Sequence, residues 1–319
     1  MATLPSSTPR IIGALDDAAR AARTQRAVDA AVAIARDAGL DVQTPKVLYD
    51  MFSVVVHLAP ADLVARIPTV LLPSDAQDPS RRLARQAREL AVVRALHATG
   101  FPVVAPSPLI TEPKERDGFC MTFWPYVEQT GAEIDAEVMA LTARLHMAMA
   151  DLKLPVTLPF LQFWDGIDEE LRMLADQPEL LTPDELQRAR SQFDALNPLL
   201  SSRDAFEQAF PQARLQPIHG DSPIANAART AEGLIIGDFE LANIGPVEID
   251  LAGMPAELLA PYEAAAGRPV DPQLFKVMSA AGVLAGVAAL ALTPQLPALV
   301  EPLMQTKAYW LSMPPLELP

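Results

Sequence analysis

The spacing of apolar positions divides the chain into a first third with strand-like alternation and a remainder with helical spacing. Residues 11 to 39 are rich in alanine with scattered charges, which predicts a helix that ends at Gly39. Three short runs follow, separated by turn residues, with the sequences PKVLYD, FSVVVHLA and DLVARI. Short β-branched runs of this kind predict an antiparallel meander.

A second helix and two further strands complete the predicted N-terminal region. The stretch from Asp78 to Gly100 opens with an Asp/Ser capping signal and closes at a glycine, which predicts a helix of about 18 residues. The runs VVAP and GFCMTFW then predict two more strands. One sheet and its helices would therefore precede residue 125.

From Gly131 onward the spacing is helical, except where LQPIHGD and LIIGDFE predict a polar hairpin among the helices. This contrast indicates a two-lobed α+β fold, with an N-lobe over residues 1–125 and a C-lobe over residues 126–319. The longest apolar run, from Val277 to Leu292, is shorter than the about 20 residues of a spanning helix and predicts a buried core helix.

Composition narrows the class of protein. The 319 residues are 50% hydrophobic and 20% charged, enough to bury a sizeable core. The single Cys120 excludes an intrachain disulfide and, with no signal peptide expected, indicates a reducing, cytoplasmic setting. A net charge of −15 disfavours nucleic acid and anionic membranes as partners and suits a cationic small substrate, although an acidic surface more often serves only solubility.

The predicted hairpin region carries the candidate chemistry. Asp221 follows an apolar run, where a carboxylate can accept a proton from an attacking hydroxyl. Asn226 comes five residues later, and Asp238 ends the run LIIGD twelve residues after that. Amide and carboxylate oxygens suit Mg²⁺, which usually binds one or two carboxylates together with substrate phosphates. A base, an asparagine and a metal-binding aspartate in this order form the catalytic half of a kinase.

On these motifs the chain resembles the aminoglycoside phosphotransferase family of small-molecule kinases, which are relatives of protein kinases. HGDSPIAN matches the family's His-Gly-Asp-x-x-x-x-Asn loop, GDFE stands at the Asp-Phe-Gly position, and GPVEIDLA matches Gly-Pro-x-x-x-Asp-Leu-Ala. The resemblance extends from about residue 45 to residue 300. It implies a bilobal protein-kinase-like fold, in which an antiparallel sheet with a helix forms the N-lobe and the C-lobe is mainly helical.

The resemblance also implies a reaction and the residues that perform it. The γ-phosphoryl group of ATP or GTP would pass to a hydroxyl group of a small molecule. Asp221 would orient or deprotonate that hydroxyl, while Asn226 and Asp238 would hold Mg²⁺. His219 and Asp250 are expected to be structural, with Asp250 bonding the backbone of the catalytic loop.

Upstream, the match rests on single residues. Arg66 stands where protein kinases have a lysine, and Glu89 lies on the inward face of the following helix. We expect the two to pair and hold the nucleotide phosphates; the alternative is an ordinary exposed arginine on a strand. No Gly-x-Gly-x-x-Gly lies between the first two strands, so phosphate cover would come from the backbone or from Ser53.

The segment TFWPYV is the expected link between the lobes, where the backbone would meet the edge of an adenine. Phe123, Trp124 and Tyr126 would line or flank the nucleotide cleft, or would simply pack the two lobes together. Glu240 replaces the glycine of Asp-Phe-Gly, which argues against the peptide flips that regulate protein kinases.

Two further groups of polar residues carry weaker hypotheses. The acidic side chains of FWDGIDEE could attract an amine-bearing acceptor, although such a run is more often a solvated helix face: they are Asp165, Asp168, Glu169 and Glu170. The remaining histidines lack the paired spacing of a metal site and are expected to be packing or surface residues, namely His57, His97 and His146.

The identity of the acceptor stays open at this level. An aminoglycoside-like antibiotic is one candidate, and a macrolide, a sugar or an amino alcohol of primary metabolism is another. A third alternative is a pseudokinase that binds nucleotide without turnover. The intact set of Asp221, Asn226 and Asp238 counts against it, whereas the missing glycines and Arg66 count modestly for it.

Overall fold

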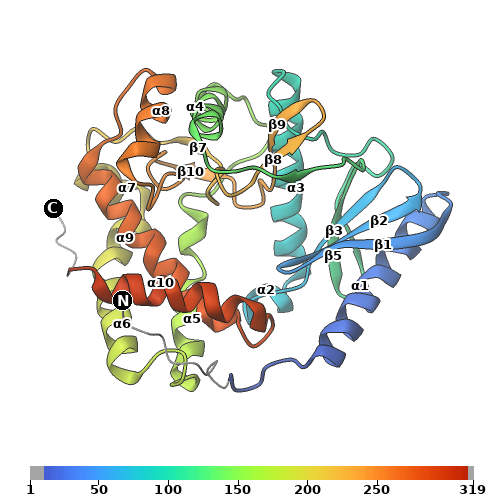
Figure 1. Ribbon diagram of the computed structural model, residues 1–319, viewed down its shortest axis with the longest axis horizontal. Helices are drawn as coiled ribbons and strands as arrows, with labels where there is room; N and C mark the ends of the chain where they lie inside the picture. The colour runs from blue at the N-terminus through green and yellow to red at the C-terminus, as the bar shows by residue number, and fades with distance from the viewer. Residues whose placement is uncertain (1–10, 315–319) are drawn as a thin grey trace.

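A five-stranded antiparallel sheet forms the N-lobe of the computed structural model, which describes residues 11–314 (Figure 1). In spatial order its strands are β1 (Val42–Asp50), β2 (Ser53–Pro60), β3 (Val64–Pro68), β5 (Phe119–Trp124) and β4 (Lys114–Arg116). β2 pairs antiparallel with both β1 and β3, so the predicted meander is confirmed.

The run VVAP, residues 103–106, is not a strand, and the prediction there is wrong. Pro102 and Pro106 bracket the run, and proline has no N–H group for a strand ladder. The neighbour of β5 on that side is instead β4, a charged run of three residues without a strand signal in its sequence.

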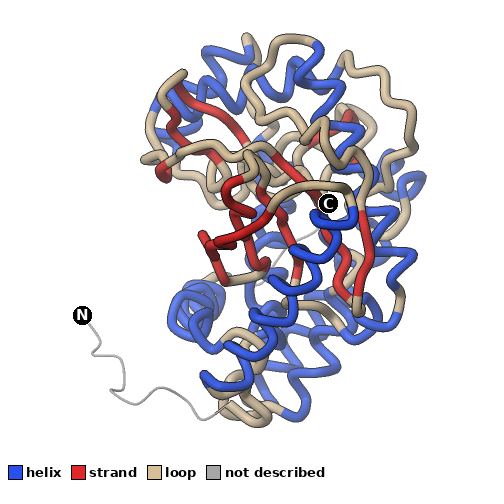
Figure 2. Tube along the Cα trace, turned by 90° about the vertical axis from the view of Figure 1, so that its right-hand side faces the viewer, coloured by secondary structure: helices blue, strands red, loops and turns tan. Residues whose placement is uncertain are grey.

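The helix α1 (Asp17–Asp37) covers the outer face of this sheet and crosses in front of the strands in Figure 2. The predicted helix began six residues too early, because Asp16 caps it by accepting a 2.7 Å hydrogen bond from the Ala19 amide. Its alanine-rich side permits close packing on the strands. The shared core includes Ala27, Ala30, Ala31, Val54, Val56, Ala65, Ile67, Met121 and Phe123.

The helix α3 (Pro79–Ala98) lies between the sheet and the C-lobe (Figure 1) and confirms the predicted second helix. Asp78 caps its N-terminus through the Arg81 amide, and the short helix α2 (Pro73–Gln77) precedes it. Its apolar side, with Val92 and Leu96, packs into the core of the C-lobe. α3 therefore connects the two lobes through packed side chains.

Helices form most of the C-lobe, as the spacing predicts. They are α4 (Ala136–Ala150), α5 (Ile167–Met173), α6 (Pro183–Leu200), α7 (Arg203–Ala209), α8 (Ala256–Ala266), α9 (Pro272–Ala288) and α10 (Val300–Ser312). Short 3₁₀ turns occupy Gln162–Trp164, Leu174–Asp176, Ala289–Leu292 and Pro297–Leu299. The predicted division at residues 125 and 126 falls in the link between β5 and α4.

The stretch Pro272–Leu292 contains the apolar run expected to be a core helix. Among residues 11–314 it is the one helix long and apolar enough to cross a membrane on length and composition alone, with a mean hydropathy of 1.9. An 18-residue window of that stretch is 56% buried inside the protein, and α9 packs against α5, α6 and α10.

Two small sheets carry the polar region of the C-lobe. β7 (Gln216–Ile218) pairs with β10 (Asn243–Gly245), while β8 (Ala227–Thr230) pairs with β9 (Gly233–Ile236) and with β6 (Thr130–Gly131). The prediction that LQPIHGD and LIIGDFE form a hairpin is wrong, because these two runs do not pair with each other. The four-residue β8, which has little strand signal of its own, takes the place beside β9.

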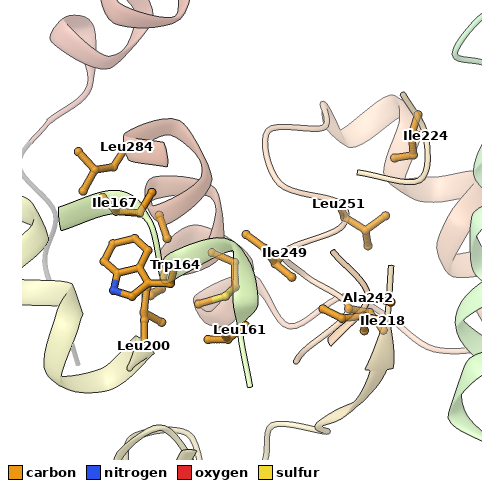
Figure 3. Close-up of a cluster of buried hydrophobic side chains, with 14 of the residues drawn as sticks. Leu161, Trp164, Ile167, Leu200, Ile218, Ile224, Ala242, Ile249, Leu251 and Leu284 are labelled. Atoms are coloured by element: carbon orange, nitrogen blue, oxygen red, sulfur yellow. The ribbon is translucent and has the colours of Figure 1, made fainter. Parts of the chain in front are cut away.

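Apolar residues next to the polar motifs anchor them in the core of the C-lobe. Figure 3 shows Ile218 and Ala242 beside Leu251, with Ile249 between this group and Leu161. Ile218 directly precedes His-Gly-Asp, and Ile249 and Leu251 flank Asp250, so burial of these side chains fixes the polar groups between them.

Candidate active site

The predicted residues come from three places: the loop between β7 and β8, the loop after β9, and the inner face of the sheet. Strand side chains alternate between faces, so the residues out of phase with the α1 core point toward the C-lobe. Arg66 is one of them, paired in register with Val55 and Thr122. Its guanidinium reaches Asp238 on the C-lobe at 2.7 Å.

Gly220 lets the catalytic loop turn tightly against a neighbouring segment. Its φ of 83° lies in the left-handed region, and an added Cβ would come within 2.1 Å of Asn243 Nδ2 and 2.2 Å of the Leu241 carbonyl oxygen. No side chain fits there. The glycine of His-Gly-Asp is therefore a steric requirement of this fold.

Asp250 holds the start of this loop from beneath. Its Oδ2 accepts a hydrogen bond from the His219 backbone amide at 2.9 Å, and its Oδ1 accepts one from the Gly220 amide at 2.8 Å. His146 on α4 lies 3.0 Å from Oδ2 through Nε2, and the Tyr262 hydroxyl lies 2.8 Å from the other ring nitrogen. This is the backbone contact that the sequence predicts for Asp250.

The hydrogen bonds of His219 define its tautomer. Its Nε2 lies 2.8 Å from the Gly237 carbonyl oxygen, which can only accept, so Nε2 carries the proton. Its Nδ1 then accepts from the Asp221 backbone amide at 3.3 Å. The ring also contacts Phe239 at 4.7 Å between centroids. A neutral His219 thus joins the catalytic loop to the residue before Asp238, which agrees with a structural role.

Asp221 lies in the loop between β7 and β8. Its side chain is accessible to solvent, yet the surrounding protein desolvates it and raises its pKa, with help from Asp238 and Asp250. The next residue, Ser222, has a φ of 44°, a costly conformation for a residue other than glycine. An accessible carboxylate on a strained, well-anchored loop suits a base that must meet a bound hydroxyl.

Asn226 and Asp238 offer the oxygen atoms for a cation. The Asn226 amide nitrogen donates to the Asp221 carbonyl at 2.7 Å, which leaves its side-chain oxygen for other partners. Asp238 has a φ of 59°, a strained backbone at the end of β9. Within residues 11–314 no three His, Cys, Asp or Glu side chains cluster as a metal site. Two hard oxygens completed by phosphates and water fit Mg²⁺.

Arg66 lies among three carboxylates. Its Nη2 is 2.7 Å from Asp238 Oδ1, and its Nη1 is 2.9 Å from Glu240 Oε2 and 3.6 Å from Glu89 Oε2. Burial alone would lower the pKa of Arg66, but Asp238, Glu240 and Glu89 outweigh it and raise that pKa. Burial raises the pKa of Glu89 to about 8. Arg66 is thus no ordinary exposed arginine, and Glu89 is the most distant of its three partners.

The link segment differs in part from its prediction. Phe123 does not line the cleft, because β5 turns its side chain into the α1 core, where it is 1% exposed. Trp124 points to the other side and packs against the C-lobe core, with its Nε1 donating to Thr122. The Tyr126 ring stacks on His57 at 4.1 Å between centroids. Trp124 and Tyr126 remain candidates for the nucleotide cleft.

The remaining N-lobe candidate, Ser53, lies on the inner face at the end of the sheet farthest from the link. It is buried and pairs in register with Pro68, beyond the pair of Val55 with Arg66. At this end the Gln295 side chain bonds both the amide and the carbonyl of Leu71, at 3.1 and 2.7 Å. The lobes are therefore connected at both ends of the cleft, and phosphate cover by Ser53 stays a prediction.

Two of the four acidic side chains of FWDGIDEE form ion pairs or hydrogen bonds within the protein. Asp168 pairs with Arg172 and Arg190, and Glu169 accepts hydrogen bonds from the Ser74 amide and hydroxyl. Burial raises the pKa of Glu170 to about 8, and burial also raises the pKa of Asp165. At least Asp168 and Glu169 thus serve the fold, and recruitment of an amine by the others stays a hypothesis.

Sequence reasoning missed three features of the site. His146 was expected to be a packing or surface residue, but it is a buried partner of Asp250. Val55 and Val64 add apolar side chains to the inner face of the sheet. Counting alternate positions along FSVVVHLA and DLVARI could have placed them there. Glu240 contacts Arg66, and no local pattern announces a contact between residues so far apart in sequence.

Comparison with known proteins agrees with this geometry. The model of the phosphotransferase enzyme family matches residues 54–276, which is most of the chain. The chain belongs to this family, and it is a small-molecule kinase with a bilobal kinase-like fold. No curated protein sequence matches it significantly.

Solved structures of similar fold are distant in sequence. The amicoumacin kinase hAmiN in complex with AMP-PNP, Ca²⁺ and Ami has a TM-score of 0.60 at 12% identity, covering 91% of this chain and 95% of the other. The choline kinase LicA from Streptococcus pneumoniae has a TM-score of 0.56 at 10% identity, covering 87% and 98%. An aminoglycoside 2'-phosphotransferase in complex with GDP has a TM-score of 0.56 at 15% identity, covering 88% and 97%.

Proposed function

We propose that this kinase transfers the γ-phosphoryl group of ATP or GTP to a hydroxyl group of an amine-bearing small molecule. One observation carries the proposal: hydrogen bonds connect the base loop, the metal loop and the phosphate anchor without a break. Asn226 bonds the Asp221 carbonyl, His219 bonds Gly237 beside Asp238, and Asp238 bonds Arg66. The three parts that phosphoryl transfer requires therefore have fixed positions relative to one another.

Each part has a defined task. Asp221 accepts the proton of the acceptor hydroxyl and orients the hydroxyl for in-line attack. Asn226 and Asp238 would hold Mg²⁺, which when bound would neutralise charge that develops on the phosphates. Arg66 would supply a positive charge to the phosphates. Because the transition state is loose, most of the rate enhancement comes from this positioning and charge neutralisation.

The proposed acceptor class rests on charge and on the relatives. Choline and aminoglycosides, named for two relatives of similar fold, carry positive charge, and this chain has a net charge of −15. An acidic protein raises the local concentration of a cationic substrate. An aminoglycoside-like antibiotic and a metabolic amino alcohol both satisfy this description.

A screen of acceptors tests the function. ATP or GTP consumption with Mg²⁺ is measured against a library of aminoglycosides, macrolides, sugars and amino alcohols. We expect stimulation by an amine-bearing alcohol, and we expect Asp221→Asn to lower that turnover by roughly 10²- to 10⁴-fold with unchanged nucleotide affinity. Tight nucleotide binding with no acceptor stimulation would instead indicate a non-catalytic binding module. Equal losses of affinity and rate would assign Asp221 a structural or metal-binding role.

A further inference from the structure

Arg66 has one close ionic partner on each arm of its guanidinium, and both partners belong to the loop after β9. Nη2 lies 2.7 Å from Asp238, and Nη1 lies 2.9 Å from Glu240. Glu89, the partner that the kinase pattern predicts, is 3.6 Å away. Among the described residues neither its buried Oε2 nor Arg66 Nη1 makes a hydrogen bond, so the contacts of Nη1 with Glu240 and Glu89 are ion pairs that differ in distance. The predicted pair is thus the longest of the three contacts.

Glu240 also has a second basic neighbour. Arg85 on α3 lies 3.9 Å from Glu240 Oε1 through its Nη1, and its Nη2 pairs at 3.0 Å with the buried Asp75. Glu240 therefore lies between Arg66 on β3 and Arg85 on α3. The ionic connection from the metal loop to the helix runs through Arg85, one turn before Glu89.

We propose that Glu240, and not Glu89, is the positioning residue that holds Arg66 in place for the nucleotide phosphates. This inference rests on the proposed function. Asp238 must share its oxygens between Arg66 and a metal ion, whereas Glu240 has no such second task. Glu240 can keep Arg66 oriented when Asp238 turns to its metal-binding role. The proposed metal ligand, Asp238, and the proposed anchor of Arg66, Glu240, then belong to the same loop.

The same geometry explains why an arginine occupies position 66. A guanidinium presents donors in a planar fork, so separate arms can meet Asp238 and Glu240 at the same time. A lysine ammonium is a compact point charge without this fixed fork geometry. Arg66 and Glu240 therefore form a matched pair, and Arg66→Lys removes most of what Glu240 contributes.

Matched amide variants test the proposal. Glu240→Gln and Glu89→Gln replace two glutamates around one arginine by the same amide, and both are measured above pH 8, where Glu89 has lost the proton that burial keeps on it at lower pH. Each is combined with Arg66→Lys, and ATP affinity with Mg²⁺ and the kcat and KM of Mg²⁺-dependent ATP hydrolysis are measured. We expect Glu240→Gln to lower kcat by roughly tenfold or more, since misplaced groups lose rate steeply. KM should change by less than about threefold, because the charge of Arg66 remains.

The control variant and the double mutants decide the outcome. Glu89→Gln should change kcat by less than about twofold. In the Arg66→Lys background, Glu240→Gln should cause little further loss, because residues that act as a unit are non-additive. A loss from Glu89→Gln as large as that from Glu240→Gln overturns the proposal. Additive losses of Arg66→Lys and Glu240→Gln overturn it too.

Failure of the proposed function would look different. A folded wild-type protein that binds neither ATP nor GTP with Mg²⁺ contradicts the kinase function itself. Urea unfolding of the same variants without nucleotide then still tests the pairing, through double-mutant cycles. The coupling of Arg66 with Glu240 should exceed its coupling with Glu89. Equal or reversed couplings reject the pairing whatever the protein binds.

Discussion

The two halves of the candidate active site are stabilised in opposite ways. Beneath the catalytic loop, Asp250 accepts hydrogen bonds from two backbone amides and lies 3.0 Å from His146, whose other ring nitrogen also has a partner. Across the cleft, one guanidinium, that of Arg66, faces three carboxylates, and a buried oxygen of Glu89 has no hydrogen bond. The first network is complete, and the second is crowded and partly unsatisfied.

This difference matches the tasks of the two regions. A buried network with every partner present is costly to disturb, so it keeps the base loop in one arrangement. In a crowded ionic cluster desolvation offsets much of the attraction, so the stability of the cluster depends on the protonation of its members and on added charges. The account therefore predicts a rigid base loop and a phosphate anchor that responds to ligand and pH.

The largest expected effect comes from breaking the complete network. Asp250→Ala leaves the amides of His219 and Gly220 and the ring of His146 without their acceptor. We expect the free energy of unfolding in urea to fall by about 3–5 kcal/mol. The surface residue Asp168 also has two charged partners, but Asp168→Ala should cost less than about 1 kcal/mol. Similar losses in both variants would show that the Asp250 network is not special.

An intermediate effect comes from relieving the ionic cluster. Burial raises the pKa of Glu89 from 4.5 to about 8, so the folded protein keeps a proton that the unfolded chain releases above pH 4.5. The free energy of unfolding therefore falls as pH rises from 4.5 to about 8. Glu89→Gln removes this dependence and should therefore stabilise the protein at pH 8, with little gain near pH 4.5.

Thermal or urea unfolding of both proteins across this pH range checks the Glu89 prediction. A pH-independent difference between wild type and Glu89→Gln would mean that Glu89 ionises in the folded protein as it does in the unfolded chain. In that case the anchor region would not be the pH-sensitive half of the site.

The smallest expected effect lies at the edge of the complete network. Tyr262→Phe removes the hydroxyl that lies 2.8 Å from His146 Nδ1 and should cost about 1 kcal/mol of unfolding free energy. Tyr309→Phe is the matched control, because that side chain is 57% exposed and should show no change. If Tyr262→Phe is as stable as its control, the Tyr262 hydroxyl does not stabilise the protein, and the stabilising network ends at His146.

The same comparison shows what could be predicted from sequence. The catalytic loop is contiguous, so the order of Asp221, Asn226 and Asp238 was visible as a motif. The partners of Arg66 lie on separate elements, and only the folded arrangement shows that Glu240 is closer than Glu89. Local spacing carries no information about such distances.

The errors in the fold have similar causes. The run VVAP has strand composition, but the adjoining prolines deny it hydrogen-bond partners. The strand β8 has four residues and too weak a pattern to be recognised, so its partner β9 was paired wrongly in the prediction. Phe123 was assigned to the cleft because the sequence alone does not show which face of β5 it occupies. In the fold that face packs into the core beneath α1. Tertiary packing decided each of these points.

Binding of nucleotide with and without Mg²⁺ shows whether Asp238 is a ligand of the metal ion. Calorimetric titration of ATP and GTP into wild-type protein and Asp238→Asn is repeated with Mg²⁺ and with EDTA, and Asp168→Asn is the control. The account predicts that Mg²⁺ tightens binding to wild type and to the control, and that Asp238→Asn loses about tenfold or more of this gain with little change in EDTA. An Asp238→Asn variant with the wild-type response to Mg²⁺ would contradict the assignment of this loop.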